Sequence, residues 1–383
     1  MKIAIPAERR AHEKRVAATP ETVKKYRALG FDVIVERGAG EASRYPDSQY
    51  VDAGATIAPD AAAALKEADI VLKVQRPQSA AEGADELALL KKGALLVSVL
   101  SPYQAPEQVK AYAAAGVNAF AMEFMPRITR AQTMDVLSSQ SNLAGYRAVI
   151  EAAYEFGRAM PMMMTAAGTV APGRVLVMGA GVAGLQAIAT ARRLGAIVSA
   201  TDVRLAAKEQ VESLGATFVV AESEELKSAE TAGGYAKEMS EDFKKKQAAL
   251  IAETIKKQDI VITTALIPGK KAPVLVDDAM VKSMKPGSII VDLAVEQGGN
   301  CTLAKPGEII EVGGVKIVGH LNLPARLATD ASALYAKNLL NFLTPLIDKE
   351  SKTLKINWDD EIIKGTALTR DGQVIHPAFK EGA

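Results

Sequence analysis

The chain has 383 residues, of which 49% are hydrophobic and 24% are charged. This length is typical of two domains, and the composition supports large cores without any sign of disorder. The 46 basic and 45 acidic residues leave a formal net charge of +1. Such a balance gives no electrostatic reason to expect a nucleic-acid partner.

The cysteine, histidine and hydropathy patterns argue against several further classes of protein. The single Cys301 excludes an intrachain disulfide and a cysteine zinc site, and it is typical of a protein in a reducing cytosol. The histidines, His12, His320 and His376, are too scattered to indicate a metal cluster. Met1 leads directly into KIAIP, so we expect no secretory signal. The most apolar run, GALLVSVLSP, is half of the roughly 20 residues that cross a bilayer.

Strand-like and helix-like patterns alternate over the first 125 residues, which predicts a parallel α/β sheet. Its first helix should begin with Thr19 as N-cap and Pro20 at the first helical position, and end at Gly30. The expected strands are KIAIP, FDVIVE, DIVLKV, ALLVSVL and NAFAMEF.

A second α/β series begins at Arg174, after a turn at PMMMTAAGTVAPG, in which we expect Met162 to Met164 to fill core space near an interdomain joint. Its expected strands are RVLVM, AIVSAT, ATFVV, DIVIT, SIIVDL and VKIVG.

A last long helix, about 327–347, is followed by TLKINW, IIKGTALTR and GQVIH, which we expect to form an antiparallel tail with a tight turn at Asp371 and Gly372. If this helix returns to the first domain, the second domain is an insertion. The predicted fold is therefore two Rossmann-like parallel-sheet domains separated by a cleft, made of residues 1–137 with 325–383 and of residues 138–324.

Gly179, Gly181 and Gly184 form the pattern G-x-G-x-x-G, with Ala180 and Val182 inside it, directly between a predicted strand and a predicted helix. In this context the first glycine permits a tight turn, the second lets a pyrophosphate approach the backbone, and the third allows close packing. The pattern therefore predicts a dinucleotide site.

Asp202 ends the next strand, where its carboxylate can accept hydrogen bonds from the adenosine ribose and repel a 2′-phosphate. This favours NAD over NADP, although Arg204, beyond Val203, could soften the discrimination. A helix cap is the alternative role for Asp202. We expect the backbone after DIVIT to close over the cofactor through Thr264, Ala265 and Leu266.

A polar segment, residues 126–148, precedes the glycine loop, and its density of donors and acceptors suits a small polar ring such as nicotinamide. The alternative is that these are capping and surface residues at the start of a long helix. The polar residues in question are Arg127, Gln132, Asp135, Ser138 and Asn142.

Four stretches, residues 126–148, 174–196, TTALIPGKKAPVL and VDLAVEQGGNC, resemble the NAD(H)-binding component of proton-translocating NAD(P) transhydrogenases, and the similarity extends over essentially the whole chain. The resemblance implies direct hydride transfer between NAD(H) on this chain and NADP(H) on the NADP(H)-binding domain of a partner, the beta subunit. It also implies separate membrane-spanning subunits, a homodimer, and a cytoplasmic location peripheral to the inner membrane. The nucleotide contacts that it implies outside the glycine loop are Arg127, Ile128, Thr129, Gln132, Asp135, Ser138, Gly234, Tyr235 and Gln247. The catalytic role among them, which is to position the dihydronicotinamide, is implied for Arg127, Gln132, Asp135 and Ser138.

Gly234, Tyr235 and Gln247 belong to an insertion, residues 222–247, whose composition alone favours a solvated surface loop. The resemblance instead implies a mobile loop that closes on NAD(H).

Two other functions remain as alternatives. The alanine dehydrogenase family shares the architecture, and Arg15 and Lys73 match its keto-acid ligands, although a structural ion-pair role is the favoured interpretation. The resemblance puts Val99 in the place of its catalytic histidine and Glu296 in the place of an aspartate, so a proton donor is missing. The second alternative is a regulatory NAD-binding module without catalysis, against which only the polar 126–138 loop argues.

Overall fold

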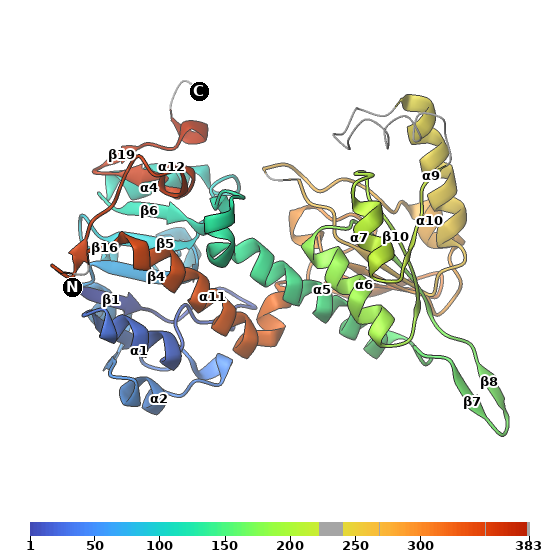
Figure 1. Cartoon of the computed structure of the whole chain (residues 1–383), viewed down its shortest axis with the longest axis horizontal. Helices are drawn as coiled ribbons and strands as arrows, with labels where there is room; N and C mark the ends of the chain where they lie inside the picture. The colour runs from blue at the N-terminus through green and yellow to red at the C-terminus, as the bar shows by residue number, and fades with distance from the viewer. Residues whose placement is uncertain (222–239, 268, 349, 381–383) are drawn as a thin grey trace. The chain divides into compact units, whose positions relative to one another are not determined.

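The computed structural model describes residues 1–221, 240–267, 269–348 and 350–380. It divides into two compact units, one made of Met1–Gln140 with Pro324–Ala383 and the other of Ser141–Leu323 (Figure 1). Each unit contains its own mainly parallel sheet, which confirms the predicted α/β class. Among the helices of the described residues, none combines the length and apolar character required to cross a membrane.

The sheet of the first unit has six strands, all of which run parallel. The five predicted strands are present, and the short edge strand β3 is an addition that the sequence did not predict. In order across the sheet the strands are β3 (Thr56–Ala58), β2 (Asp32–Glu36), β1 (Lys2–Ile5), β4 (Ile70–Gln75), β5 (Leu95–Val99) and β6 (Asn118–Ala121).

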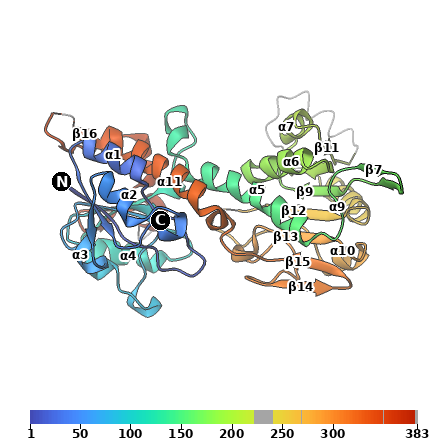
Figure 2. The ribbon, with the colours of Figure 1, turned by 90° about the horizontal axis from the view of Figure 1, so that it is seen from below.

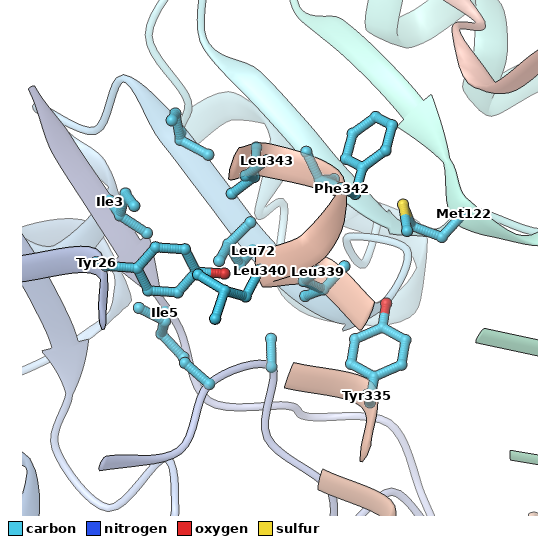
Figure 3. Packing of buried hydrophobic residues seen from close by; sticks show 14 of the residues in the cluster. Ile3, Ile5, Tyr26, Leu72, Met122, Tyr335, Leu339, Leu340, Phe342 and Leu343 are labelled. Atoms are coloured by element: carbon cyan, nitrogen blue, oxygen red, sulfur yellow. The ribbon is translucent and has the colours of Figure 1, made fainter. Parts of the chain in front are cut away.

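Helices cover both faces of this sheet, because alternate residues of each strand point to opposite sides. Ile3 and Ile5 pack with α1 (Pro20–Ala28) and α11 (Ala328–Leu343), whereas Ala4 packs with α3 (Ala61–Leu65) and α4 (Pro106–Ala114). Figure 3 shows the first of these layers, in which Tyr335, Leu339 and Phe342 of α11 lie against the sheet. The remaining α-helices of the unit are α2 (Asp47–Asp52) and α12 (Glu361–Thr366).

The first helix begins and ends as predicted. Thr19 is its N-cap, and the Oγ1 atom of Thr22 accepts a hydrogen bond from the Thr19 N–H at 2.9 Å. Pro20 occupies the first turn, where its missing N–H costs no hydrogen bond. Gly30 follows the helix with a φ of +93°, a conformation that L-residues with side chains rarely adopt.

The sheet of the second unit has seven strands, of which six run parallel and are the six predicted ones. The seventh, β14, lies at an edge and pairs antiparallel with β15 through a turn at Gly313 and Gly314 (Figure 2). The order is β11 (Thr217–Phe218), β10 (Ile197–Thr201), β9 (Arg174–Met178), β12 (Ile260–Thr263), β13 (Ile289–Asp292), β15 (Val315–Val318) and β14 (Ile309–Val312).

Both faces of the second sheet are also covered. Val175 and Val177 pack with α6 (Val182–Arg193) and with the later portion of α5 (Val136–Glu155), whereas Leu176 packs with α9 (Glu241–Ile255) and α10 (Asp278–Ser283). α7 (Ala207–Ser213) joins the first of these layers. Gly145 brings α5 close to α6, since a Cβ atom there would collide with the Ala183 carbonyl.

The expectation that Met162 to Met164 fill core space is wrong. They lie at the start of a hairpin of β7 (Met163–Thr165) and β8 (Gly168–Val170), which extends away from the sheet of its unit (Figure 1). Their exposed fractions are 60%, 43% and 79%. A two-stranded ribbon has no second layer of its own, so its side chains stay exposed on both faces.

The antiparallel tail is only partly as predicted. Asp371 and Gly372, with φ of +47° and +83°, make the expected tight turn between β18 (Thr369–Arg370) and β19 (Gln373–Val374). The first half of IIKGTALTR is instead the helix α12, because Asp360 caps it by accepting the Ile362 N–H at 2.8 Å. Of TLKINW, only β17 (Thr353–Leu354) is a strand, and it pairs with β16 (Ile347–Asp348).

Candidate dinucleotide site

The three glycines of the loop between β9 and α6 differ in what surrounds them. Gly179 has a φ of +106°, and a Cβ atom there would collide with the Thr264 hydroxyl. A Cβ atom on Gly184 would collide with the Gly179 carbonyl, so this glycine is required for α6 to pack on the loop. At Gly181 a Cβ atom would meet no atom within 4 Å in the part of the chain that the structure describes. Its face of the loop is therefore open to a ligand at the N-terminus of α6.

Asp202 follows β10 and is joined directly to this loop. Its Oδ2 atom accepts the Ala180 N–H at 2.7 Å, and its Oδ1 atom accepts the Arg204 N–H at 2.8 Å. The Arg204 guanidinium donates to both oxygens, at 2.9 Å from Nε and 3.0 Å from Nη2. Burial of the carboxyl raises its pKa, but the hydrogen bonds from Arg204 and Ala180 outweigh burial and lower the net pKa of Asp202.

The backbone after β12 lies against the same loop. Thr264 donates from its hydroxyl to the Gly179 carbonyl at 3.2 Å. The neighbouring Leu266 is 48% exposed, and Ile267, which the sequence pattern did not indicate, is 42% exposed. Val182 and Val203 are exposed as well, at 41% and 91%. The glycine loop is thus accompanied by exposed apolar side chains, which suit the flat face of an adenine or nicotinamide ring.

The position of Ala265 is fixed by a buried network that the sequence did not reveal. The Asn300 side chain accepts the Ala265 N–H at 3.0 Å and donates to the carbonyls of Ala265 and Pro273, at 2.9 and 2.8 Å. Asp292 in turn accepts the Asn300 N–H at 2.8 Å, and both side chains belong to fully buried residues. The only signal in the sequence is an acid at the end of the strand SIIVDL, followed by Gly-Gly-Asn.

Gln247 on α9 contacts the sheet of its own unit. Its Oε1 atom accepts the Ala221 N–H at 2.7 Å, and its Nε2 atom donates to the Thr201 hydroxyl and the Val219 carbonyl, both at 3.1 Å. The amide is therefore engaged by the strand that leads to Asp202. Gly234 and Tyr235 lie outside the described residues.

The polar loop predicted to hold nicotinamide belongs to the first unit and contains a 3-10 helix, Thr129–Met134. Ala131 and Met134 are buried, and Asn338 and Asn341 of α11 donate to the Thr133 carbonyl at 2.8 and 3.1 Å. This anchoring leaves Arg127, Thr129 and Gln132 exposed and Ile128 half-buried.

Asp135 and Ser138 have a role of their own at the start of α5. The Asp135 carboxylate accepts the Ser138 N–H at 3.0 Å and also its hydroxyl. This is a helix cap, which was the alternative account of these residues. Both side chains are half-buried. Asn142 donates to Gln186 at 3.3 Å.

Arg15 and Lys73 lie in buried ion pairs, in agreement with the structural role favoured for them. Arg15 donates to both Glu13 carboxylate oxygens, at 2.8 and 2.7 Å, and Lys73 lies 3.2 Å from Glu86 and 3.5 Å from Glu8. Burial raises the pKa of Glu13, but Arg15 outweighs burial and lowers it to about 2. Both cations are therefore neutralised by carboxylates of the chain itself.

Val99 ends β5, and the two following N–H groups, of Leu100 and Ser101, donate to the Glu123 carboxylate. Burial raises the pKa of Glu123 to about 7. Glu296 accepts the Asn322 N–H at 3.1 Å, so it holds the chain near the end of the second unit.

Comparisons with known proteins agree with this architecture. The N-terminal domain model of alanine dehydrogenase/PNT matches residues 4–144, and the C-terminal domain model matches residues 148–377. The chain is 63% identical over 379 residues to the first part of the NAD(P) transhydrogenase alpha subunit of Rhodospirillum rubrum, with 99% of each chain covered. It is 30% identical to the alanine dehydrogenase of Halomonas elongata, with 100% of this chain and 96% of the relative covered.

Among solved structures, a transhydrogenase from Sinorhizobium meliloti superposes with a TM-score of 0.89 at 55% identity, and 98% of this chain and 100% of that chain are covered. The two domain models, the relatives in sequence and the solved structure thus indicate the same family. The chain belongs to the alanine dehydrogenase/PNT family, and within it to the relatives of the NAD(P) transhydrogenase alpha subunit.

Proposed function

We propose that this chain is the NAD(H)-binding component of a proton-translocating NAD(P) transhydrogenase. The observation that carries the proposal is the Asp202 carboxylate, held at the end of β10 and hydrogen-bonded to the Ala180 N–H of the glycine loop. A carboxylate in this place accepts hydrogen bonds from a ribose and repels a 2′-phosphate. NADH is therefore the favoured ligand, and NADPH the disfavoured one.

Different residues of the second unit suit different parts of a dinucleotide. The open face at Gly181 and the N–H groups at the start of α6 suit the pyrophosphate. Val203 and Leu266 offer apolar contact to the rings. The backbone that leads to Leu266 is held by the hydrogen bonds that Thr264 and Ala265 donate to other parts of the same unit. We assign nucleotide contacts also to Arg204, Gly234, Tyr235 and Gln247. We place the NAD(H)-binding domain at residues 138–324.

In the first unit, we assign the positioning of nicotinamide to the polar loop, through Arg127, Gln132, Asp135 and Ser138, with Ile128 and Thr129 beside them. The exposed Gln132 offers both donors and an acceptor to a carboxamide, and the loop is anchored by Ala131, so these groups can be held in place. When bound, NADH supplies a hydride that leaves nicotinamide C4 with both electrons and reduces NADP+ on the partner. That exchange needs no proton donor on this chain.

The partners follow from the same proposal. We expect an NADP(H)-binding domain of a beta subunit to face this chain, and separate membrane-spanning subunits to carry the protons. The chain is then cytoplasmic and peripheral to the inner membrane through those subunits. We also propose a homodimer, for which the exposed methionines of the β7–β8 hairpin offer apolar surface.

The test is reconstitution. The purified chain is mixed with an NADP(H)-binding partner domain, and reduction of an NADP analogue by NADH is followed at the nicotinamide absorbance. Transfer that depends on both proteins supports the proposal. Binding of NADH without any transfer would favour the regulatory module.

An alanine dehydrogenase activity is the second candidate, favoured by the retained Arg15 and Lys73. It is opposed by their pairing with Glu13 and Glu86, and by Val99 at the strand end where that family has its proton donor. Pyruvate and ammonia are added to the chain with NADH. Substrate-dependent NADH oxidation would move the assignment to that activity.

A further inference from the structure

The Asp202 carboxylate has no acceptor position left for a ribose. A carboxylate offers about four lone-pair positions. Among the described residues, four donors point at Asp202: the N–H groups of Ala180 and Arg204, and the Nε and Nη2 atoms of the Arg204 guanidinium, all within 3.0 Å. Two ribose hydroxyls therefore cannot bind until two of these donors leave.

The four donors differ in how easily they can leave. The Ala180 N–H belongs to the glycine loop, and the Arg204 N–H belongs to the backbone that immediately follows Asp202, so both are fixed by the fold. The guanidinium is held only through a side chain that is 54% exposed, whereas the side chain of Asp202 is 7% exposed. A long exposed side chain rotates on a nanosecond scale without any change of the backbone. The guanidinium is thus the donor pair that can be exchanged for hydroxyls.

We propose that Arg204 is a specificity-determining residue that masks Asp202 and competes with the adenosine ribose of NAD(H) for its carboxylate. This inference rests on the proposed NAD(H) binding and refines it. When the ribose displaces the guanidinium, the freed cation stays next to the 2′-position. There it attracts a 2′-phosphate, which the Asp202 carboxylate repels. Arg204 therefore weakens NADH binding and strengthens the residual binding of NADPH.

The proposal predicts opposite effects of one substitution on two ligands. In Arg204→Gln the competing cation is gone, so NADH should bind about fivefold more tightly, the scale set by an exposed ion pair. NADPH should bind more weakly than to the native chain by a similar factor. A residue that only supported the local structure would change both affinities in the same direction.

The matched control is Arg193→Gln, which removes the same charge from the C-terminal end of α6. This helix has 12 residues, so its last turn lies about 18 Å from the glycine loop. The control reports the long-range loss of one positive charge, and it should leave both affinities nearly unchanged because that distance exceeds the screening length of about 8 Å at physiological ionic strength. Circular dichroism of each variant verifies that it is folded.

Asp202→Asn supplies the second arm, because an amide cannot hold the guanidinium by two charge-assisted hydrogen bonds. In that background Arg204→Gln should no longer tighten NADH binding. Dissociation constants for NADH and NADPH are measured by calorimetry at one ionic strength for the native chain, both arginine variants, Asp202→Asn and the double variant.

The outcomes separate the two claims. A native chain that does not bind NADH contradicts the proposed function itself. If NADH binds but Arg204→Gln leaves its affinity unchanged or lower, or tightens it equally in the Asp202→Asn background, the masking role of Arg204 is wrong while NAD(H) binding stands.

Discussion

Asn300 holds Ala265 by both sides of its backbone: the side-chain Oδ1 atom accepts the Ala265 N–H at 3.0 Å, and Nδ2 donates to the Ala265 carbonyl at 2.9 Å. The two residues are 35 positions apart and follow neighbouring strands, β12 and β13. A single buried amide thus fixes the backbone that lies against the glycine loop. Asp292 fixes that amide in turn, through the Asn300 N–H.

We predict that Asn300→Ala lowers both stability and NADH affinity. It leaves the Ala265 N–H and the Ala265 and Pro273 carbonyls without their partner, at about 1–3 kcal/mol for a buried unsatisfied group. Urea unfolding measures the free energy of unfolding, and NADH titration below the transition measures affinity. An affinity equal to that of the native chain, in a variant that is destabilised, would show that Asn300 serves the fold alone.

Two glycines of one loop should respond oppositely to alanine. Gly184→Ala places a Cβ atom on the Gly179 carbonyl, so the variant should lose about 2 kcal/mol or more of stability. The methyl group of Gly181→Ala would meet no atom of the described residues within 4 Å, and the φ at this position is −78°, so the melting temperature should stay close to the native value. Its NADH affinity should fall by about tenfold or more, because the methyl group blocks the approach of the pyrophosphate. A Gly181→Ala chain that binds NADH normally would mean that the ligand does not use this face.

The half-buried Glu123 should make stability fall as pH rises. Its pKa is raised by burial from 4.5 to about 7, so the folded chain holds a proton that the unfolded chain has released. The stability that this group contributes is fully present below pH 4.5 and is lost as pH rises from there through about 7, with a total of about 3 kcal/mol.

Glu123→Gln removes the titrating group and should flatten this decline. Urea unfolding at several pH values between 5 and 8 measures the slope, with the exposed Glu67→Gln as the control. Equal slopes in the native and Glu123→Gln chains would contradict a carboxyl of raised pKa at this position.

Gln132→Ala tests the polar loop. The exposed Gln132 makes none of the adenosine contacts proposed for Gly181 and Asp202, so NADH affinity should remain nearly native. Hydride transfer should slow by on the order of a hundredfold if the nicotinamide is misplaced by about 1 Å.

The measurement is single-turnover transfer from NADH to an NADP analogue in the reconstituted complex, with NADH binding followed in parallel. Thr133→Ala is the matched control, since Thr133 is the exposed neighbour and its anchoring contacts use its backbone carbonyl. Transfer at the native rate in Gln132→Ala, or a loss of NADH binding in proportion to the rate, would rule out the positioning role.

Local signals in the sequence determined the regions of the chain whose structure depends on near neighbours. The α/β class, every strand of the two sheets except the edge strands β3 and β14, and the boundaries of α1 follow from hydrophobic period and capping residues such as Thr19. The glycine loop is equally local, since Gly179 to Gly184 lie between a strand and a helix that the sequence already indicates. The turn at Asp371 was predicted for the same reason.

The tertiary structure decided what depends on residues far apart in sequence. Nothing near Asn300 shows that its amide meets a backbone 35 positions earlier, and nothing near Gly145 shows that a carbonyl of α6 lies against it. Methionine is a residue type typical of a core, and the methionines of β7 are exposed only because no second layer packs on the hairpin. Even at Asp202 the sequence indicated the carboxylate, whereas only the folded geometry showed that Arg204 occupies it, because a side chain's partner is set by direction as well as proximity.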